Sequence, residues 1–362
     1  MENLKHSSQL ANEMQSILNN SKIDLGILDL GCGGGPDNIF RELDGSGIHI
    51  NYHGYDFNDD EINRLCESYP SNFQFFSKKI VTNQMVEMEE KWWSNFSAGQ
   101  ASINANISEF SKNQILENNF WNSELVSKSN VEITVKEILE SSQTDFNLLK
   151  IDLDGPDFGY LQDFFKNTNY IPQFVSLEIN YQGSGSSNAN TFHNTDRFMK
   201  DKGYELMAIT SRTYSHKSLP SRFEYNIFAQ TIKGIPYQGD AFYFKKNEYL
   251  NIGEIFRDII LLDAFNLEDQ AASIVLDNWS LIGVENSETI LNSLTREVWG
   301  SEFKKYKDLI DMWDKDKFFF YPQEKKLQSD ILSNVLDLRI KVLLKILVKK
   351  LVKKIFFNST QQ

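Results

Sequence analysis

The chain has 362 residues, enough for about two domains, and 41% of them are hydrophobic. Aromatic residues make up 13%, including 27 Phe, so a sizeable core can form and a wholly disordered chain is excluded. The formal net charge of −13 disfavours an extended basic face, so we expect no nucleic-acid partner.

The two cysteines, Cys32 and Cys66, form neither a disulfide framework nor a CxxC motif. This cysteine usage is typical of a reducing compartment, and we expect a cytoplasmic protein. Residues 1–10 lack the apolar core of a signal peptide, and no run of about 18 uncharged apolar residues predicts a membrane-spanning helix.

Short apolar runs alternate with helical patterns through the first 80 residues. The pattern predicts helices over 1–22, 36–43 and 60–68, and strands over 23–30, 49–55 and 73–76. This alternation is typical of a doubly wound α/β sheet. Residues 80–130 show little periodicity and are predicted to form a long insertion or lid.

The alternation then resumes and later gives way to helical spacing. The remaining predicted elements are helices over 135–140, 158–166 and 191–202, and strands over 146–152, 174–179, 204–210 and 241–245. The predicted sheet therefore has seven strands. We predict three parts: a sheet domain over 1–249, a helical region over 250–337 and a tail over 338–362.

A glycine-rich turn follows the first predicted strand, in the run Asp29-Leu30-Gly31-Cys32-Gly33-Gly34-Gly35-Pro36. Such a turn between a strand and a helix lets the backbone approach a ligand closely. A dinucleotide fingerprint requires G-x-G-x-x-G, but Pro36 occupies the position of its third glycine. The spacing G-x-G-x-G, with an acidic residue two positions earlier, resembles motif I of class I S-adenosylmethionine-dependent methyltransferases.

Asp56 ends the second predicted strand, 27 residues after Asp29. In this fold an acidic side chain at that place can accept hydrogen bonds from both ribose hydroxyls of an adenosyl group. The resemblance implies that S-adenosylmethionine is bound by Asp29, Gly31, Cys32, Gly33, Gly35 and Asp56.

A third motif, Lys150-Ile151-Asp152-Leu153-Asp154-Gly155, resembles the K-I-D-x-E-G segment of FkbM-type methyltransferases. Three further segments match that family in order: Gly99-Gln100-Ala101-Ser102-Ile103, Ser176-Leu177-Glu178 and Lys202-Gly203-Tyr204-Glu205. The resemblance covers residues 23–246. The chain departs from the family pattern with Asp154 in place of Glu and with Pro156-Asp157 in place of Ala-Glu.

The resemblance implies an O-methyltransferase, and a carboxylate near the sulfonium can take the proton of the acceptor hydroxyl. Asp152 and Glu178 end neighbouring predicted strands and are the predicted catalytic residues, whereas His193 is a weaker candidate. Paired carboxylates can also hold Mg²⁺, but no His is matched to such a site and no metal is assigned. Polar and aromatic residues over 220–243 suit a sugar or another hydroxyl-bearing acceptor.

Residues 338–362 hold seven basic and no acidic residues, which leaves 30 basic and 50 acidic residues, a net charge of −20, on the rest of the chain. Between positions 338 and 357 lysines recur every four residues beside an apolar face, a pattern that predicts a basic amphipathic helix on an anionic membrane surface. The alternative is a terminal helix that packs on the acidic body of the protein.

We therefore expect a cytoplasmic methyltransferase, bound peripherally to the inner face of the plasma membrane, that methylates a small-molecule or saccharide acceptor. Two alternatives remain at this point. One is a catalytically inactive binding module with the same fold, and the other is a nicotinamide-dependent oxidoreductase.

Overall fold

The computed structural model describes residues 2–18, 23–82, 129, 131–142, 144–153, 157–182, 187, 189–214, 234–246, 248–294, 312 and 315. The chain divides into two units, Met1–Leu294 and Thr295–Gln362. Most of the predicted lid (83–128), most of the acceptor segment (215–233) and the whole tail (338–362) lie outside the described residues. The predicted domain boundaries after residues 249 and 337 therefore stay predictions.

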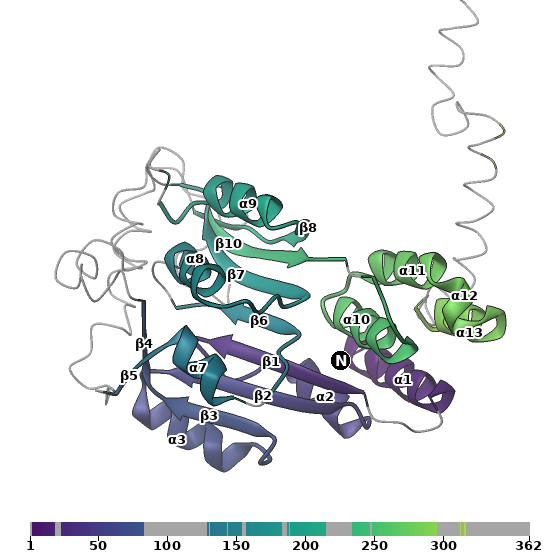
Figure 1. The fold of residues 1–362 in the computed structure, drawn as a ribbon, viewed down its shortest axis with the longest axis horizontal. Helices are drawn as coiled ribbons and strands as arrows, with labels where there is room; N and C mark the ends of the chain where they lie inside the picture. The colour runs from purple at the N-terminus through teal and green to yellow at the C-terminus, as the bar shows by residue number, and fades with distance from the viewer. Residues whose placement is uncertain are drawn as a thin grey trace, which may run out of the picture. The chain divides into compact units, whose positions relative to one another are not determined.

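A mixed sheet forms the centre of the first unit (Figure 1). Its strands are β1 (Asp24–Leu30), β2 (His49–Asp56), β3 (Phe73–Ser77), β6 (Leu148–Ile151), β7 (Phe174–Asn180), β8 (Glu205–Ile209), β9 (Arg212–Tyr214) and β10 (Ile235–Phe244). They lie in the order β3-β2-β1-β6-β7-β10-β8, and β9 also pairs with β10. The first five strands of this order run parallel, whereas β10 runs antiparallel to β7, β8 and β9. The predicted α/β doubly wound fold is confirmed.

The sheet has eight strands rather than the predicted seven because β10 begins at Ile235, six residues before the predicted start. The first half of β10 was not predicted because it contains Pro236, which is uncommon inside strands, and the polar run from Gln238 to Asp240. The added length of β10 gives β9 an edge to pair with. Separately, β4 (Lys79–Val81) pairs with β5 (Glu132–Thr134) and joins the two ends of the predicted insertion.

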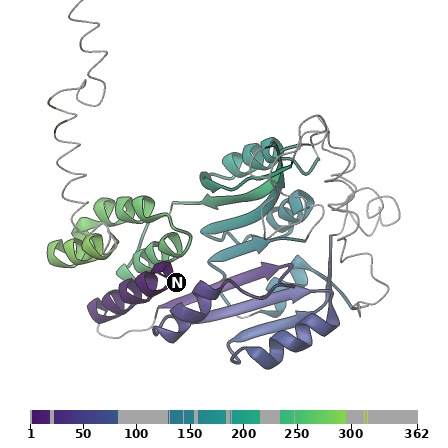
Figure 2. The same ribbon diagram turned by 180° about the vertical axis from the view of Figure 1, so that it is seen from behind.

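Helices lie on both faces of the sheet (Figures 1 and 2). They are α1 (Glu2–Ile17), α2 (Asn38–Gly45), α3 (Asp59–Ser68), α7 (Val135–Ser141), α8 (Asp157–Asn167), α9 (Phe192–Asp201), α10 (Ile252–Ala264), α11 (Glu268–Asp277), α12 (Trp279–Ile282) and α13 (Val284–Leu294). Helix α1 packs on α2, α10 and α13, so the first helix of the chain joins the helices that follow the sheet. None of the helices in the described ranges is long and apolar enough to cross a membrane.

Two helix starts show how local sequence sets these boundaries. The side chain of Asn58 accepts a hydrogen bond from the backbone N–H of Glu61 and begins α3. Thr134 and Glu137 form a capping box that begins α7. Both helices begin within one residue of the predicted positions.

Alternation along the strands sends successive side chains to opposite faces of the sheet. Leu28 and Leu30 of β1 belong to the large core cluster that also contains buried residues of α7, α8 and α9. Ile27 and Asp29 occupy the alternate positions and point to the opposite face. That second face is the one on which Phe242 of β10 contacts Phe265 at the end of α10, with ring centroids 5.0 Å apart.

Candidate functional site

The glycine-rich turn lies at the carboxyl end of β1, beside the place where the strand order reverses. On one side of β1 lie β2 and β3, and on the other lie β6 and β7. In open α/β sheets this topological switch point is where ligands bind. The backbone N–H groups of Gly31 and Cys32 both donate to the carbonyl oxygen of Tyr55, at 2.8 and 3.2 Å, which ties the turn to the end of β2.

Two of the predicted glycines are required by the protein's own packing. Gly31 has φ +98°, and a Cβ there would stand 1.7 Å from the carbonyl oxygen of Asp152. Gly35 has φ +82°, and a Cβ there would stand 3.0 Å from the side chain of Leu65. Backbone with such positive φ favours glycine. These two glycines are therefore explained without a ligand.

The other two glycines of the turn differ from each other. A Cβ on Gly33 would stand 3.0 Å from a carboxylate oxygen of Asp56, so this glycine lets Asp56 approach the turn. A Cβ on Gly34 would meet nothing within 4 Å. Gly34, which the motif spacing does not single out, is therefore the position of the turn that faces open space.

The side chain of Cys32 points beneath the turn rather than towards a ligand. It is 1% exposed, and a Cβ on Gly54 of β2 would stand 2.7 Å from its Sγ atom. Burial, together with the nearby carboxylates of Asp29 and Asp56, raises the pKa of this thiol well above its usual value. Cys32 is thus a neutral packing residue, and only its backbone can face a bound molecule.

Asp56 contacts the glycine turn. Its carboxylate accepts hydrogen bonds from the backbone N–H groups of Gly33, Phe57 and Asn58, and the bond from Asn58 is 2.8 Å long. Burial raises the pKa of Asp56, although these three donors lower it in part. An ionised carboxylate has about four acceptor positions, so a ribose would have to use the remaining one or replace the N–H of Gly33.

Asp29 is buried and fully committed to protein partners. It accepts a hydrogen bond of 2.6 Å from the hydroxyl of Tyr52, and its Oδ1 lies 3.2 Å from Nζ of Lys150. Asp29 and Lys150 are register partners across β1 and β6, so both side chains leave the same face of the sheet. Burial alone would lower the pKa of Lys150, but the carboxylates of Asp29 and Asp152 raise it overall. Asp29 therefore holds Lys150 and Tyr52 in place below the glycine turn.

Asp152 follows β6 at the carboxyl edge, and its backbone N–H donates to the carbonyl oxygen of Leu30 at 2.8 Å. Its Oδ2 lies 3.8 Å from Nζ of Lys150, and the side chain is 35% exposed. Burial of the group raises the pKa of Asp152, and the charge of Lys150 lowers it in part. A partly exposed carboxylate with a raised pKa is suited to accept a proton.

Glu178 is held far more tightly than Asp152. Its Oε1 accepts hydrogen bonds of 2.7 Å from both Arg212 Nη1 and Gln238 Nε2. Arg212 also lies 3.5 Å from Asp240, which is the register partner of Glu178 across β7 and β10. Burial alone would lower the pKa of Arg212, but Glu178 and Asp240 raise it overall. Glu178 thus forms part of an ion-pair cluster that positions Arg212.

The structure brings the predicted carboxylates to one edge and one face of the sheet. Ile151 and Leu177 are register partners, so Asp152 and Glu178 follow at adjacent positions. Sequence reasoning missed Lys150 as a bridging residue, and it missed Arg212 because β9 was not predicted. It placed Gln238 and Asp240 in the polar acceptor segment over 220–243 but not in β10, which it began too late. His193 lies exposed on α9, and Asp154 lies outside the described residues.

Within the described ranges, no group of three or more His, Cys, Asp or Glu is placed to hold a metal ion.

Comparison with known proteins gives only distant likenesses. No family model matches the sequence, and no curated protein matches it. Solved structures with some likeness include precorrin-6y C5,15-methyltransferase from Geobacter metallireducens GS-15, with 11% identity, a TM-score of 0.28, and 66% of this chain and 88% of that chain covered. The 23S rRNA methyltransferase ErmE has 9% identity and a TM-score of 0.28, with 79% and 96% covered.

The plantazolicin methyltransferase BpumL, solved in complex with a substrate analogue and SAH, has 12% identity and a TM-score of 0.27, with 67% of this chain and 86% of that chain covered. Likenesses at these TM-scores carry no argument about activity. The fold assignment rests on the strand order and on the helices that cover both faces of the sheet.

The different surroundings of two glycines predict different responses to the same substitution. Gly31→Ala should lower the free energy of unfolding by roughly 2–4 kcal/mol, because its Cβ would meet the carbonyl oxygen of Asp152 at a positive φ. Gly34→Ala, the matched control, should change it by less than about 0.5 kcal/mol. Urea denaturation followed by circular dichroism measures both. Equal losses in the two variants would contradict this account of the turn.

Proposed function

We propose that the chain is an S-adenosylmethionine-dependent methyltransferase whose cofactor binds at the glycine-rich turn. The observation that carries the proposal is the meeting of this turn with Asp56 at the switch point of the sheet. There the end of β1 offers an open position at Gly34, and the end of β2 offers a carboxylate that already touches the turn.

The charges around the turn favour a cationic ligand over a pyrophosphate. The carboxylates of Asp29, Asp56 and Asp152 lie near it, and the nearby cation Lys150 is paired with two of them. A dinucleotide would place two negative phosphates in this field, whereas S-adenosylmethionine brings a positive sulfonium. The antiparallel β10 between β7 and β8 also departs from the all-parallel order of dinucleotide-binding sheets.

The residues present fit such a cofactor. Gly34 leaves room for a group beside the backbone, and the remaining acceptor position of Asp56 suits a ribose hydroxyl. The backbone of the turn from Gly31 to Gly35 would face the methionine part. When bound, the cofactor would supply an electrophilic methyl group on its sulfonium sulfur.

The proposed acceptor is a hydroxyl of a sugar, in a glycan or a saccharide precursor, and the proposed family is the FkbM type. Both rest on the sequence resemblance around Lys150 and Asp152 and on polar residues between positions 220 and 243. The ion-pair cluster of Glu178, Arg212 and Asp240 supports this acceptor class, because these groups can hydrogen-bond to several hydroxyls.

In the proposed mechanism Asp152 takes the proton of the acceptor hydroxyl as the new carbon–oxygen bond forms. Its carboxylate is partly exposed, and Nζ of Lys150 lies 3.8 Å from Oδ2, beyond hydrogen-bond distance. The carboxylate can therefore receive a proton. Glu178 keeps Arg212 in place and does not act as the base, because Arg212 and Gln238 stabilise its ionised form. Alignment of the acceptor by this cluster would supply most of the rate enhancement.

Calorimetric titration of the full chain with S-adenosylmethionine tests the proposal. We expect binding, and we expect Gly34→Leu to weaken it at least about tenfold, because the new side chain fills the open space without striking the protein. Asp56→Ala should weaken it by a similar factor. Asp60→Ala is the matched control, since this aspartate lies exposed on α3.

Two binding results and one assay of methyl transfer decide between the methyltransferase, the oxidoreductase and the inactive binding module. If calorimetry detects no binding at millimolar S-adenosylmethionine, the methyltransferase proposal is wrong. Binding of NAD instead would indicate an oxidoreductase. Binding of S-adenosylmethionine together with no methyl transfer to any glycan would favour the inactive binding module.

The protonation of Asp152 gives a second prediction. Asp152→Asn should lower methyl transfer to a saccharide acceptor by about 10²–10⁴-fold while cofactor binding remains. Lys150 lowers the pKa of Asp152, so Lys150→Gln should raise that pKa, and the acidic limb of the pH–rate profile should move to higher pH. Transfer of a labelled methyl group measures both effects. An unmoved acidic limb in a folded Lys150→Gln variant would exclude Asp152 as the base.

The tail supplies the third prediction. We propose that residues 338–357 bind an anionic membrane surface, which rests on the basic amphipathic pattern of the sequence. Deletion of residues 338–362 should abolish flotation with vesicles that contain phosphatidylserine and leave cofactor binding unchanged. Equal flotation of the full and shortened chains would show that the tail is not the anchor.

A further inference from the structure

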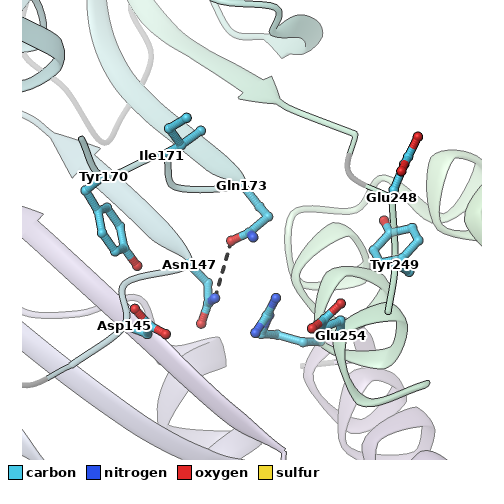
Figure 3. Close-up of a pocket in the computed structure, with 9 residues that line it drawn as sticks. Asp145, Asn147, Tyr170, Ile171, Gln173, Glu248, Tyr249 and Glu254 are labelled. Carbon is cyan, nitrogen blue, oxygen red and sulfur yellow. Dashed lines mark hydrogen bonds between the residues drawn. The ribbon is translucent and has the colours of Figure 1, made fainter. Parts of the chain in front are cut away.

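A cavity lies at the opposite edge of the sheet from the glycine turn. It has a volume of about 430 Å³, within the range of small-molecule sites. Residues just before β6 and β7 form one side, and residues between β10 and the first turns of α10 form the other (Figure 3). The four residues of β6 separate Asn147 here from Asp152 at the other edge, roughly 16 Å along a strand.

The inner part of this cavity, which lies at the amino ends of β6 and β7, contains side chains that can donate hydrogen bonds. Asn147 is 4% exposed, and its Oδ1 accepts from the backbone N–H of Gly26. Its Nδ2 donates to Oε1 of Gln173, a bond drawn in Figure 3. This bond turns the Gln173 amide so that Nε2 is left without an acceptor among the described residues.

Arg257 adds a cation that its surroundings do not satisfy. Its Nε has no hydrogen-bond partner in the described part of the chain, and it lies 3.7 Å from Oδ1 of Asp258. Burial raises the pKa of Asp258 to about 7, so near neutral pH this carboxyl group compensates the guanidinium only in part. A guanidinium in such a place is suited to a two-point contact with a carboxylate.

The rim of the cavity carries the opposite charge. Asp145 and Glu248 are exposed and lie on opposite sides of the cavity in Figure 3, and neither forms an ion pair within the described ranges. Glu254 is different, because its carboxylate caps the start of α10 by accepting from the backbone N–H of Leu250 and the side chain of Asn251. The cavity therefore carries a partly compensated cation inside and carboxylates at the mouth.

We propose that this cavity binds a small zwitterion of the α-amino acid class. The carboxylate of the ligand would meet Arg257 and the amide donor of Gln173, and its ammonium group would meet Asp145 or Glu248. The rings of Tyr170 and Tyr249 would line the space left for its side chain. A neutral sugar would leave the charges of both signs uncompensated, and a simple anion would be repelled at the rim.

Ligand-observed NMR and calorimetry on the full chain test this proposal. The probes are L-phenylalanine, L-leucine, L-glutamate and L-lysine, with phenethylamine and 3-phenylpropionate as analogues that keep one charge each, and glucose as a neutral ligand. At least one amino acid should bind with a Kd of about 1 mM or lower, and the single-charge analogues should bind at least roughly tenfold more weakly.

Variants identify the site. Arg257→Gln should weaken amino acid binding at least about tenfold, and Glu248→Gln, at an exposed position, should weaken it by roughly threefold. Glu285→Gln on the exposed side of α13 is the matched control and should change nothing. Binding of S-adenosylmethionine should be unchanged in all three, which separates this site from the proposed cofactor site and shows that the variants are folded.

Three results would overturn the proposal. They are no binding of any amino acid at about 10 mM, binding that neither Arg257→Gln nor Glu248→Gln weakens, and binding of glucose in preference to every amino acid probe.

Discussion

The pairing of Asp29 with Lys150 is the interaction on which the arrangement of the carboxyl edge depends. The two residues are register partners on the central strands β1 and β6, and Asp29 is 2% exposed. A carboxylate buried to this degree is costly unless it is paired and hydrogen-bonded. Lys150 provides the charge and the hydroxyl of Tyr52 provides the hydrogen bond. Removal of Lys150 would leave the buried carboxylate of Asp29 uncompensated beneath the glycine turn.

The carboxylates at this edge of the sheet differ in their partners and in their exposure. Asp29 is buried and paired with Lys150, and the same Lys150 lies 3.8 Å from Asp152, so the ion pair links the two carboxylates. The more distant Glu178 is occupied in the same way by Arg212 and Gln238. Of these three carboxylates, Asp152 is the one with a substantially exposed side chain and without a close hydrogen-bonded cation in the described residues.

The two faces of the sheet are used differently. One face is apolar and is covered by α7, α8 and α9, so it holds the strands in place through burial of hydrophobic area. The other face carries the register partners Asp29 and Lys150 and, two residues beyond the partner of Lys150 on β7, Glu178. These buried polar groups are tolerated because they pair with one another and with other side chains of the sheet.

The sequence by itself determined most of the strands and helices and their order along the chain, the glycine turn and the charge of the tail. These features depend on neighbouring residues, through apolar periodicity, capping and turn geometry. It also placed Asp29, Asp56, Asp152 and Glu178 at strand ends. Only the tertiary structure decided their partners, because Asp29 meets Lys150 across 121 positions and Glu178 meets Gln238 across 60. Strand register sets such contacts, and no local pattern encodes register between distant strands.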